Sequence, residues 1–384
     1  MEKPVIRISV RNLVEFILRN GDLESGGTAG DKEAMLKGSR LHRKIQKQMG
    51  SHYQAEVSLK KDTEYEDLIL RVEGRADGIF TQNEKICIDE IKGVYKNLEL
   101  LAEPVLVHRA QALCYAWIYL DDHGLEEIDV QMTYAHLDTE MIKRFRETMT
   151  REELESWYQR LLDSYHKWLS YQMKWREKRN RSMEKLEFPF IYRKGQKEMV
   201  AGIYHAISRK EQIFIQAPTG VGKTMSAVFP AVRSIGEGKA ETLFYLTART
   251  ITRTVAQDAF EILRKNGLLF KTVTITAKEK LCFCEKPECN PETCPYAKGH
   301  YDRINDAVYE LWTNEQSFDR ETILRQAEKW QVCPFEMSLE LSVWMDAVIC
   351  DYNYVFDPNV YLKRFFGENI SGKYLFLIDE LIIL

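Results

Sequence analysis

Short runs of alternating apolar and polar residues occur before residue 150, and they predict strands over 68–73 and 85–91. Over residues 151–185 the pattern changes. Apolar side chains recur there every three or four positions among many Glu, Lys and Arg residues, which predicts one long amphipathic helix that ends in a basic linker. A mixed strand and helix pattern followed by a long helix predicts a compact α/β domain with a connector behind it.

Apolar runs at 212–216, 242–246 and 374–378 predict buried strands in the second half of the chain. Helix-compatible sequence lies between them, so this half is expected to be a second α/β domain. The expected organisation is a first domain over residues 1–150, a helix and linker over 151–187, and a second domain over 188–384 with an insertion at about 275–340.

Composition places the chain among ordinary globular proteins, with 45% hydrophobic and 29% charged residues in 384 positions. The net charge of −4 excludes whole-molecule attraction to nucleic acid, so any such contact must come from local basic patches. No signal-peptide pattern opens the chain and no apolar run reaches the length of a membrane span, so we expect a cytoplasmic protein that does not bind membranes.

The segment 217–224, Ala-Pro-Thr-Gly-Val-Gly-Lys-Thr, has the composition of a phosphate-binding loop. Gly220 and Gly222 allow backbone N–H groups to surround phosphates, Lys223 reaches the β and γ oxygens, and Thr224 suits Mg²⁺. Ala217 stands where the usual pattern has its first glycine. The loop lies between a predicted strand and a helix-compatible segment, and we therefore expect it to bind ATP.

Two further segments support a nucleotide site. Upstream of the loop, Tyr192, Arg193 and Gln196 combine an aromatic face with an amide, which suits recognition of adenine. At the other end of the domain, the predicted strand 374–378 delivers Asp379 and Glu380. Asp379 is expected to bind Mg²⁺, and Glu380 to activate the attacking water.

The first domain carries a candidate metal site on its predicted strands. Asp77 precedes the strand that holds Glu90 and Lys92, and the strand period places these last two on one face. Two carboxylates on neighbouring strands can bind a divalent cation, and a nearby ammonium can stabilise charge that develops on a phosphate. Asp89 points the other way and is expected to be an outer or surface acid. Solvent-facing strand residues are the alternative interpretation.

Flanking helices add an imidazole at His42, and Gln111 and Tyr115 one turn apart on one face. Together with Asp77, Glu90 and Lys92, this set resembles the RecB-like branch of the PD-(D/E)XK nucleases over roughly residues 8–120. The resemblance implies His42, Asp77 and Glu90 as ligands of Mg²⁺ or Mn²⁺, Lys92 as the catalytic lysine, and Gln111 and Tyr115 as an associated motif. It implies a metal-dependent DNA nuclease.

Eight cysteines are present. Cys87, Cys114 and Cys350 have apolar neighbours and are expected in the core. The other five fall in the expected insertion, and their clustering favours metal ligation, by zinc or by an iron–sulfur cluster. They are Cys282, Cys284, Cys289, Cys294 and Cys333.

The insertion, closed by Cys333-Pro-Phe-Glu, resembles that of the XPD/DinG family of superfamily 2 DNA helicases, and the segment 351–357 adds to the resemblance. The family carries a [4Fe–4S] cluster, which implies Cys282, Cys289, Cys294 and Cys333 as its ligands, with Cys284 competing for the first position. The resemblance implies a 5′–3′ ATP-dependent helicase acting on single-stranded or branched DNA in repair or processing. Colourless protein with zinc at the cysteines is the alternative.

Family members follow Asp-Glu with Ala-His, whereas Leu381–Leu384 follow Glu380 here. We therefore expect the second motor domain to be missing, and unwinding to depend on a separate polypeptide that supplies it. Transition-state charge stabilisation of the kind lost with it contributes about 10³–10⁵ in rate in other NTPases. The alternative is a truncated, catalytically inert fragment that binds ATP and DNA.

Overall fold

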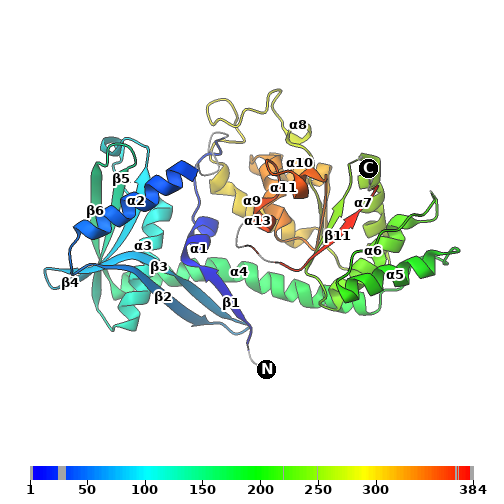
Figure 1. Ribbon diagram of the computed structural model, residues 1–384, viewed down its shortest axis with the longest axis horizontal. Coiled ribbons are helices and arrows are strands. Elements are labelled where there is room, and N and C mark those ends of the chain that lie inside the picture. Colours follow the sequence, from blue (N-terminus) through cyan, green and yellow to red (C-terminus); the bar gives the residue numbers. More distant parts are fainter. Residues whose placement is uncertain are drawn as a thin grey trace. The chain divides into compact units, whose positions relative to one another are not determined.

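A computed structural model describes residues 3–24, 32–218, 220–248, 250–367, 370 and 372–380 (Figure 1). The chain divides into two compact units, Met1–Ser170 and Tyr171–Leu384, and each contains its own sheet. The residues after Glu380, on which the expectation about the end of the chain depends, lie outside the described residues.

The first unit is built on a six-stranded mixed sheet in the order β1-β3-β4-β5-β6, with β2 paired to β3. Only the β1–β3 and β4–β5 pairs are parallel. The two strands predicted at 68–73 and 85–91 are confirmed as parts of β3 and β4. The strands are β1 (Val5–Ser9), β2 (Gln54–Glu64), β3 (Ile69–Gln82), β4 (Lys85–Val94), β5 (Glu127–His136) and β6 (Ile142–Thr150).

The central strands of this sheet are buried on both faces, and helices cover part of it. β5 has eight consecutive buried residues, and α3 packs on both β4 and β5. Cys87 on β4 and Cys114 on α3 are fully buried, which confirms them as core residues. The remaining helices of this part are α1 (Val10–Ile17), α2 (Lys32–Gln48), the 3₁₀ turn η1 (Leu98–Leu100) and α3 (Leu106–Asp122).

The predicted long helix is confirmed as α4 (Arg151–Glu184). Its second half belongs to the second unit, where Trp175 Nε1 and Arg179 Nη1 donate to opposite oxygens of the buried Asp346 at 2.9 and 2.6 Å. Arg233 Nη1 donates to the carbonyls of Met183 and Glu184, at 2.9 and 2.8 Å. Those carbonyls lie in the last turn of α4, where they have no partner within the helix, so Arg233 caps its end.

The second unit contains a parallel sheet in the order β11-β7-β10-β8-β9. Parallel strands joined through helices account for its apolar core, which includes Cys350 on β10. No helix in the described ranges is long and apolar enough to cross a bilayer. The strands are β7 (Thr242–Leu246), β8 (Thr272–Thr274), β9 (Ser317–Phe318), β10 (Ala347–Cys350) and β11 (Tyr374–Ile378).

Nine helices of this unit are described, and they separate its strands along the chain. α6 and α7 pack against one another. They contribute to the core of this unit, α6 through Val228 and Val232 and α7 through Phe260. The helices are α5 (Gln196–Arg209), α6 (Lys223–Gly236), α7 (Thr250–Lys265), α8 (Lys278–Leu281), α9 (His300–Asn314), α10 (Arg320–Trp330), α11 (Pro334–Ser342), α12 (Asn353–Phe356) and α13 (Lys363–Phe366).

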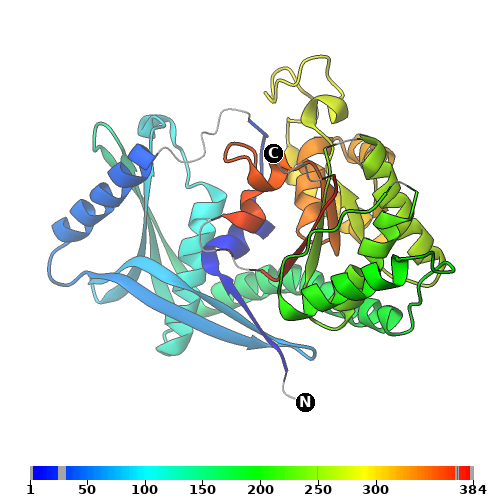
Figure 2. The same cartoon turned by 45° about the vertical axis from the view of Figure 1, so that its right-hand side comes forward.

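The buried strand predicted at 212–216 is wrong for this structure. These residues form no strand, and Ile213, Phe214 and Ile215 are 46, 68 and 40% exposed. A buried strand needs a neighbour that satisfies its backbone groups, and this segment pairs with none of the described strands. β11 forms the edge of the described sheet (Figure 2). Phe376 on this strand is 38% exposed.

Candidate functional site

The carboxylates and the lysine predicted on the first sheet lie together. In the β3–β4 register Gly78 is opposite Asp89, which places Asp77 next to Glu90. Lys92 Nζ donates to Glu90 Oε1 at 2.8 Å, so the two side chains do share a face as their spacing predicts. The N–H of Ile91 donates to Asp77 Oδ2 at 2.7 Å. Backbone and side chain together thus hold the acids; we call Asp77, Glu90 and Lys92 the β3–β4 site.

Burial dominates the electrostatics of this site. Glu90 is 5% exposed, and burial raises its pKa to about 8, against the opposing effect of Lys92. Burial also raises the pKa of Asp77, opposed by His42. Glu90 Oε2 is buried and has no hydrogen-bond partner among the described residues. An unsatisfied buried carboxylate oxygen is costly, and a bound cation would satisfy it.

His42 approaches the same acids from α2. Its Nδ1 lies 3.8 Å from Asp77 Oδ1. One turn later Gln46 Nε2 donates to the carbonyl of Asp77 at 3.0 Å. Gln46 was not predicted from the sequence. A polar residue on the apolar side of α2, beside Leu41 and Ile45, could have indicated a buried hydrogen bond there. His42, Asp77 and Glu90 are the right donors for Mg²⁺ or Mn²⁺, but no group of three such residues in the described ranges is already close enough to hold a metal.

Helix α3 contributes the two other expected residues. Gln111 is 5% exposed, and its Oε1 accepts a hydrogen bond from Lys92 Nζ at 2.6 Å. Tyr115, one turn later, lies against the backbone of β3, because a Cβ placed on Gly74 would be 2.7 Å from the tyrosine hydroxyl. Gln111 therefore positions the lysine, whereas Tyr115 requires a glycine on the strand that carries Asp77.

Asp89, expected as an outer or surface acid, points away from Glu90 as its spacing predicts but is not at the surface. It is fully buried on the opposite face of β4, where it accepts from Thr133 Oγ1, Tyr53 Oη and Gln131 Nε2 at 2.6, 3.0 and 3.1 Å. Three donors offset the cost of burying this carboxylate. The missed signal was the polar pair Gln131 and Thr133 inside an apolar strand.

In the second unit the phosphate loop has the expected backbone. Gly220 and Gly222 have φ values of 83° and 77°, which a side chain disfavours, and α6 begins directly after them. Lys223 Nζ donates to the carbonyl of Ala217 at 3.2 Å. The side chain of Lys223 thus folds back onto the loop. A bound phosphate would compete with the Ala217 carbonyl for its ammonium group.

Arg193 and Gln196, upstream of this loop, form hydrogen bonds with its backbone. Gln196 Nε2 donates to the carbonyl of Val221 at 2.7 Å, and its Oε1 accepts from the N–H of Arg193 at 2.7 Å. The Arg193 guanidinium donates to the carbonyl of Gly220. The Gln196 amide expected to read adenine is therefore engaged with the protein itself.

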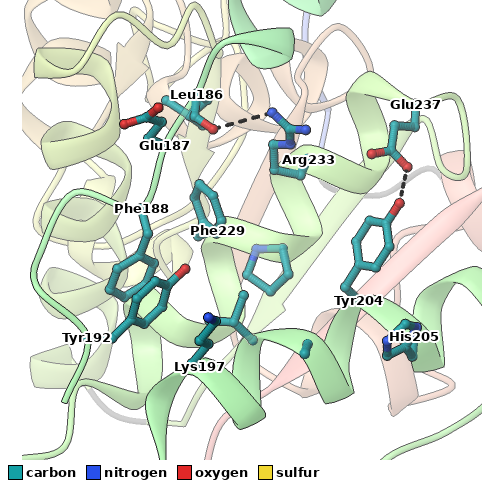
Figure 3. Close-up of a pocket in the computed structure, with 13 residues that line it drawn as sticks. Leu186, Glu187, Phe188, Tyr192, Lys197, Tyr204, His205, Phe229, Arg233 and Glu237 are labelled. Carbon is teal, nitrogen blue, oxygen red and sulfur yellow. Dashed lines mark hydrogen bonds between the residues drawn. The ribbon is translucent and has the colours of Figure 1, made fainter.

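Tyr192 lies beside a pocket of about 640 Å³ formed by α5, α6 and the segment 186–192 (Figure 3). Its ring stacks on Phe188, with centroids 4.3 Å apart and planes 13° apart, and Phe229 meets Phe188 edge-on at 5.5 Å. Figure 3 shows Arg233 and Glu237 at the other end of the pocket, where Tyr204 Oη donates to Glu237 at 2.7 Å. The aromatic end suits a planar ring.

Asp379 follows β11, and its N–H donates to the carbonyl of Leu246 at 3.0 Å. Its Oδ2 accepts from Tyr245 Oη at 2.7 Å. The neighbouring strand β7 thus holds the acid that was expected to bind Mg²⁺. Glu380 is exposed, with a φ of 57°.

The five cysteines of the insertion lie on the segments around α8 and before α11. Cys289, Cys294 and Cys333 are buried, whereas Cys282 and Cys284 are half-buried. The Sγ atoms of Cys284 and Cys294 are 3.8 Å apart, close to the separation of about 3.8 Å that two thiolates have on one tetrahedral zinc with bonds of about 2.3 Å. Burial raises the pKa of Cys333 to about 12. Its thiol is therefore protonated unless a metal binds.

Two family models match the second unit. Residues 193–288 match the DEAD/DEAH box helicase model, and residues 265–380 match DEAD_2. Residues 193–380 are helicase-like. The matches support the resemblance to XPD-like superfamily 2 helicases, and the parallel sheet is consistent with a RecA-like helicase fold. ATP and Mg²⁺ are the ligands that this family implies.

Curated relatives include the "Regulator of telomere elongation helicase 1 homolog" proteins of Caenorhabditis briggsae and Caenorhabditis elegans. Each is 22% identical, over 243 and 239 residues, or 52 and 51% of this chain. The chain spans 24% of the length of either relative.

Solved structures described as "XPD_Helicase" and "Truncated XPD" are 16 and 18% identical, with TM-scores of 0.32 and 0.30. They cover 49 and 48% of this chain, and 32 and 52% of their own chains. The strand order of the chain's own sheet, rather than this distant likeness, supports the fold.

Proposed function

We propose that this chain joins a metal-dependent DNA nuclease to the ATP-binding part of an XPD-like DNA helicase that acts in DNA repair or processing. The nuclease domain is assigned to residues 1–150, the connecting helix and linker to 151–187, and the helicase part to 188–384, with the cysteine insertion at about 275–340. The single observation that carries the nuclease is the β3–β4 site, where a buried glutamate oxygen without a partner lies beside an aspartate and a lysine.

The chemistry follows from these positions. His42, Asp77 and Glu90 would hold the Mg²⁺ or Mn²⁺, which would supply an activated water and a positive charge next to the scissile phosphate. Lys92 donates to Glu90 in this structure. When a cation also binds the Glu90 carboxylate, the ammonium of Lys92 would be free to stabilise the negative charge that develops on phosphate oxygens. Gln111 keeps that ammonium in place from the other side.

In the helicase part, Ala217, Gly220, Gly222, Lys223 and Thr224 are proposed to bind the ATP phosphates, and Tyr192, Arg193 and Gln196 to form the adenine end. Asp379, which accepts a hydrogen bond from Tyr245, would share Mg²⁺ with Thr224. Glu380 is proposed to orient the attacking water. The energy of hydrolysis would serve movement on DNA.

The insertion is proposed to hold a [4Fe–4S] cluster through Cys282, Cys289, Cys294 and Cys333. Four thiolates on neighbouring segments suit such a cluster, which would stiffen the insertion when bound. The proximity of Cys284 to Cys294 favours Cys284 as a competitor of Cys282, and zinc as a competing metal. Iron and zinc analysis of protein purified without oxygen, with its visible spectrum, distinguishes the two metals.

The deciding experiment for the nuclease measures cleavage of labelled single-stranded and duplex DNA with Mg²⁺ or Mn²⁺, with and without ATP. Asp77→Ala and Lys92→Ala should lose cleavage. Lys85→Ala is the matched control, because Lys85 lies at the exposed far end of the same strand, paired with Glu127. Cleavage at the wild-type rate by Lys92→Ala contradicts the proposal. Absence of cleavage by correctly folded wild-type protein favours a protein that only binds ATP and DNA.

A further inference from the structure

Helix α2, which carries His42 to the β3–β4 site, also exposes a basic face. Arg40, Arg43, Lys44 and Lys47 are spaced three and four residues apart, so they lie on one side of the helix, and all four are exposed. Leu41, Ile45 and Gln46 occupy the buried side. The helix therefore separates a face that packs on the unit from a face that carries only positive charge at these positions.

Little of that charge is neutralised. Lys44 pairs with Glu140. Arg43 Nε donates to the carbonyl of Ser39 at 3.2 Å, which leaves its charge uncompensated. Within the described ranges no carboxylate lies within ion-pair distance of Arg40, Arg43 or Lys47. We call these three residues the α2 ridge.

The ridge has the length of a short stretch of nucleic-acid backbone. Lys47 lies seven positions after Arg40, which is about 10 Å at the rise of an α-helix. One strand of B-DNA places a phosphate about every 3.4 Å along its axis, so about three phosphates fit beside the ridge. The chain as a whole is acidic, so such attraction must be local.

The ridge and the proposed catalytic site share one helix. His42, which reaches to 3.8 Å from Asp77, lies between Arg40 and Arg43 in the chain. Gln46, next to Lys47, donates to the backbone of Asp77. α2 packs against β4, the strand of Glu90 and Lys92 (Figure 2). The side of α2 that carries His42 and Gln46 thus contacts the β3–β4 site, and the ridge lies on the exposed side of the same helix.

We propose that the α2 ridge binds the phosphate backbone of the DNA strand that enters the β3–β4 site. This inference rests on the proposed nuclease function. It assigns to Arg40, Arg43 and Lys47 the part of substrate binding that is independent of base sequence and of metal. An acidic protein would also match the charge; nucleic acid is favoured because the same helix carries His42 to the carboxylates and the lysine proposed to cleave phosphodiesters.

The test measures the affinity of the full chain for short labelled single-stranded and duplex DNA, without divalent metal, over a series of salt concentrations. Each lost phosphate contact reduces the slope of log affinity against log salt by about 0.7 for a single strand or 0.9 for a duplex. The triple variant Arg40→Gln/Arg43→Gln/Lys47→Gln should therefore lower the slope by about 2.1 or 2.7. The form of DNA that shows its full expected fall in slope is the form that lies on the ridge.

Two control variants and a folding check make the result specific. Arg7→Gln/Lys60→Gln/Arg160→Gln removes three exposed charges from β1, β2 and α4 of the same unit and should leave the slope within about one contact of the wild type. Arg40→Lys/Arg43→Lys keeps the charge and should keep the slope. Circular dichroism should show native folding of every variant. An unchanged slope in the ridge variant, or an equal fall in both triple variants, overturns the proposal.

The design separates this inference from the nuclease proposal. Binding is read without metal, so it does not depend on cleavage, and Asp77→Ala should bind with the wild-type slope. If the chain cleaves DNA, the ridge variant should raise KM and leave kcat near the wild-type value, because its residues do not touch the reacting atoms. If the chain cleaves nothing, a ridge-specific slope change still supports a backbone-binding surface.

Discussion

The β3–β4 site and the phosphate loop differ in how far each is assembled without ligand. In the first unit, hydrogen bonds to Ile91, Lys92 and Gln111 hold the catalytic candidates in a buried position on paired strands. In the second, the loop follows an unpaired and exposed segment, 212–216, and its lysine donates to a loop carbonyl. Paired strands hold the side chains of the β3–β4 site in place before a ligand binds. The conformation of the phosphate loop depends instead on whether the segment 212–216 pairs with a strand.

The largest expected difference is in backbone hydrogen exchange. Amides of β4 should exchange at least about 10³-fold more slowly than those of 212–216, because paired core strands open only with global unfolding. Mass spectrometry of peptides covering both segments measures this, with β7 as the protected control of the second unit. Equal protection of 212–216 and β7 would show that the pre-loop strand is formed in solution, and the comparison would fail.

Crossed variants test whether the two sites work separately. Lys92→Ala should reduce DNA cleavage by about 10²–10³, the typical loss of one transition-state donor, and leave ATP binding unchanged. Lys223→Ala should weaken ATP binding by about 10- to 100-fold, because one hydrogen bond to a charged group is lost, and leave metal-dependent cleavage unchanged. Cleavage assays and titration with a fluorescent ATP analogue measure both. Loss of both activities in either variant would contradict separate sites.

Stability of the second unit should depend on pH through Lys271. Burial lowers the pKa of this lysine from 10.5 to about 8, opposed by Asp346. Between these values the unfolded lysine keeps a proton that the folded one has released, so stability should rise with pH through this window. Relative to Lys271→Met, the wild type should gain up to roughly 3 kcal/mol.

Urea unfolding at several pH values between about 7.5 and 10.5 measures this difference. Lys265→Met, at the exposed end of α7, is the control and should follow the wild type at every pH. A parallel course of wild type and Lys271→Met across the window would show that Lys271 stays charged in the folded protein.

The smallest expected effect concerns Asp89, on the face of β4 opposite Glu90. Thr133→Val removes the 2.6 Å donor to the buried Asp89 and should destabilise the first unit by about 1.5–3 kcal/mol, the usual value of a hydrogen bond to a charged group. Thr81→Val, on an exposed position of β3, should change stability by less than about 0.5 kcal/mol. Chemical denaturation measures both, and similar losses in the two variants would argue against a pre-organised strand.

Local rules predicted the parts of each site that lie close together in the chain. The period of a strand placed Glu90 and Lys92 on one face, and their 2.8 Å contact agrees. Glycines before a Lys-Thr pair predicted a phosphate-binding loop, and in the structure Gly220 and Gly222 have the positive φ that a side chain disfavours. Helical spacing predicted a long helix from about residue 151, and α4 begins at Arg151; the helix also includes most of the segment expected as a basic linker. In each case the geometry depends on neighbours within one turn or one strand.

Only the tertiary structure decided which distant residues meet. Nothing in the spacing indicated that Tyr53, Gln131 and Thr133 would surround Asp89, or that Gln46 would contact the strand of Asp77, because strand pairing and helix packing bring them together. Pairing also decided against the strand at 212–216. By itself the sequence determined which residues carry the chemistry and their local conformation; burial and partners came from the fold, since a strand's environment depends on segments far away in the chain.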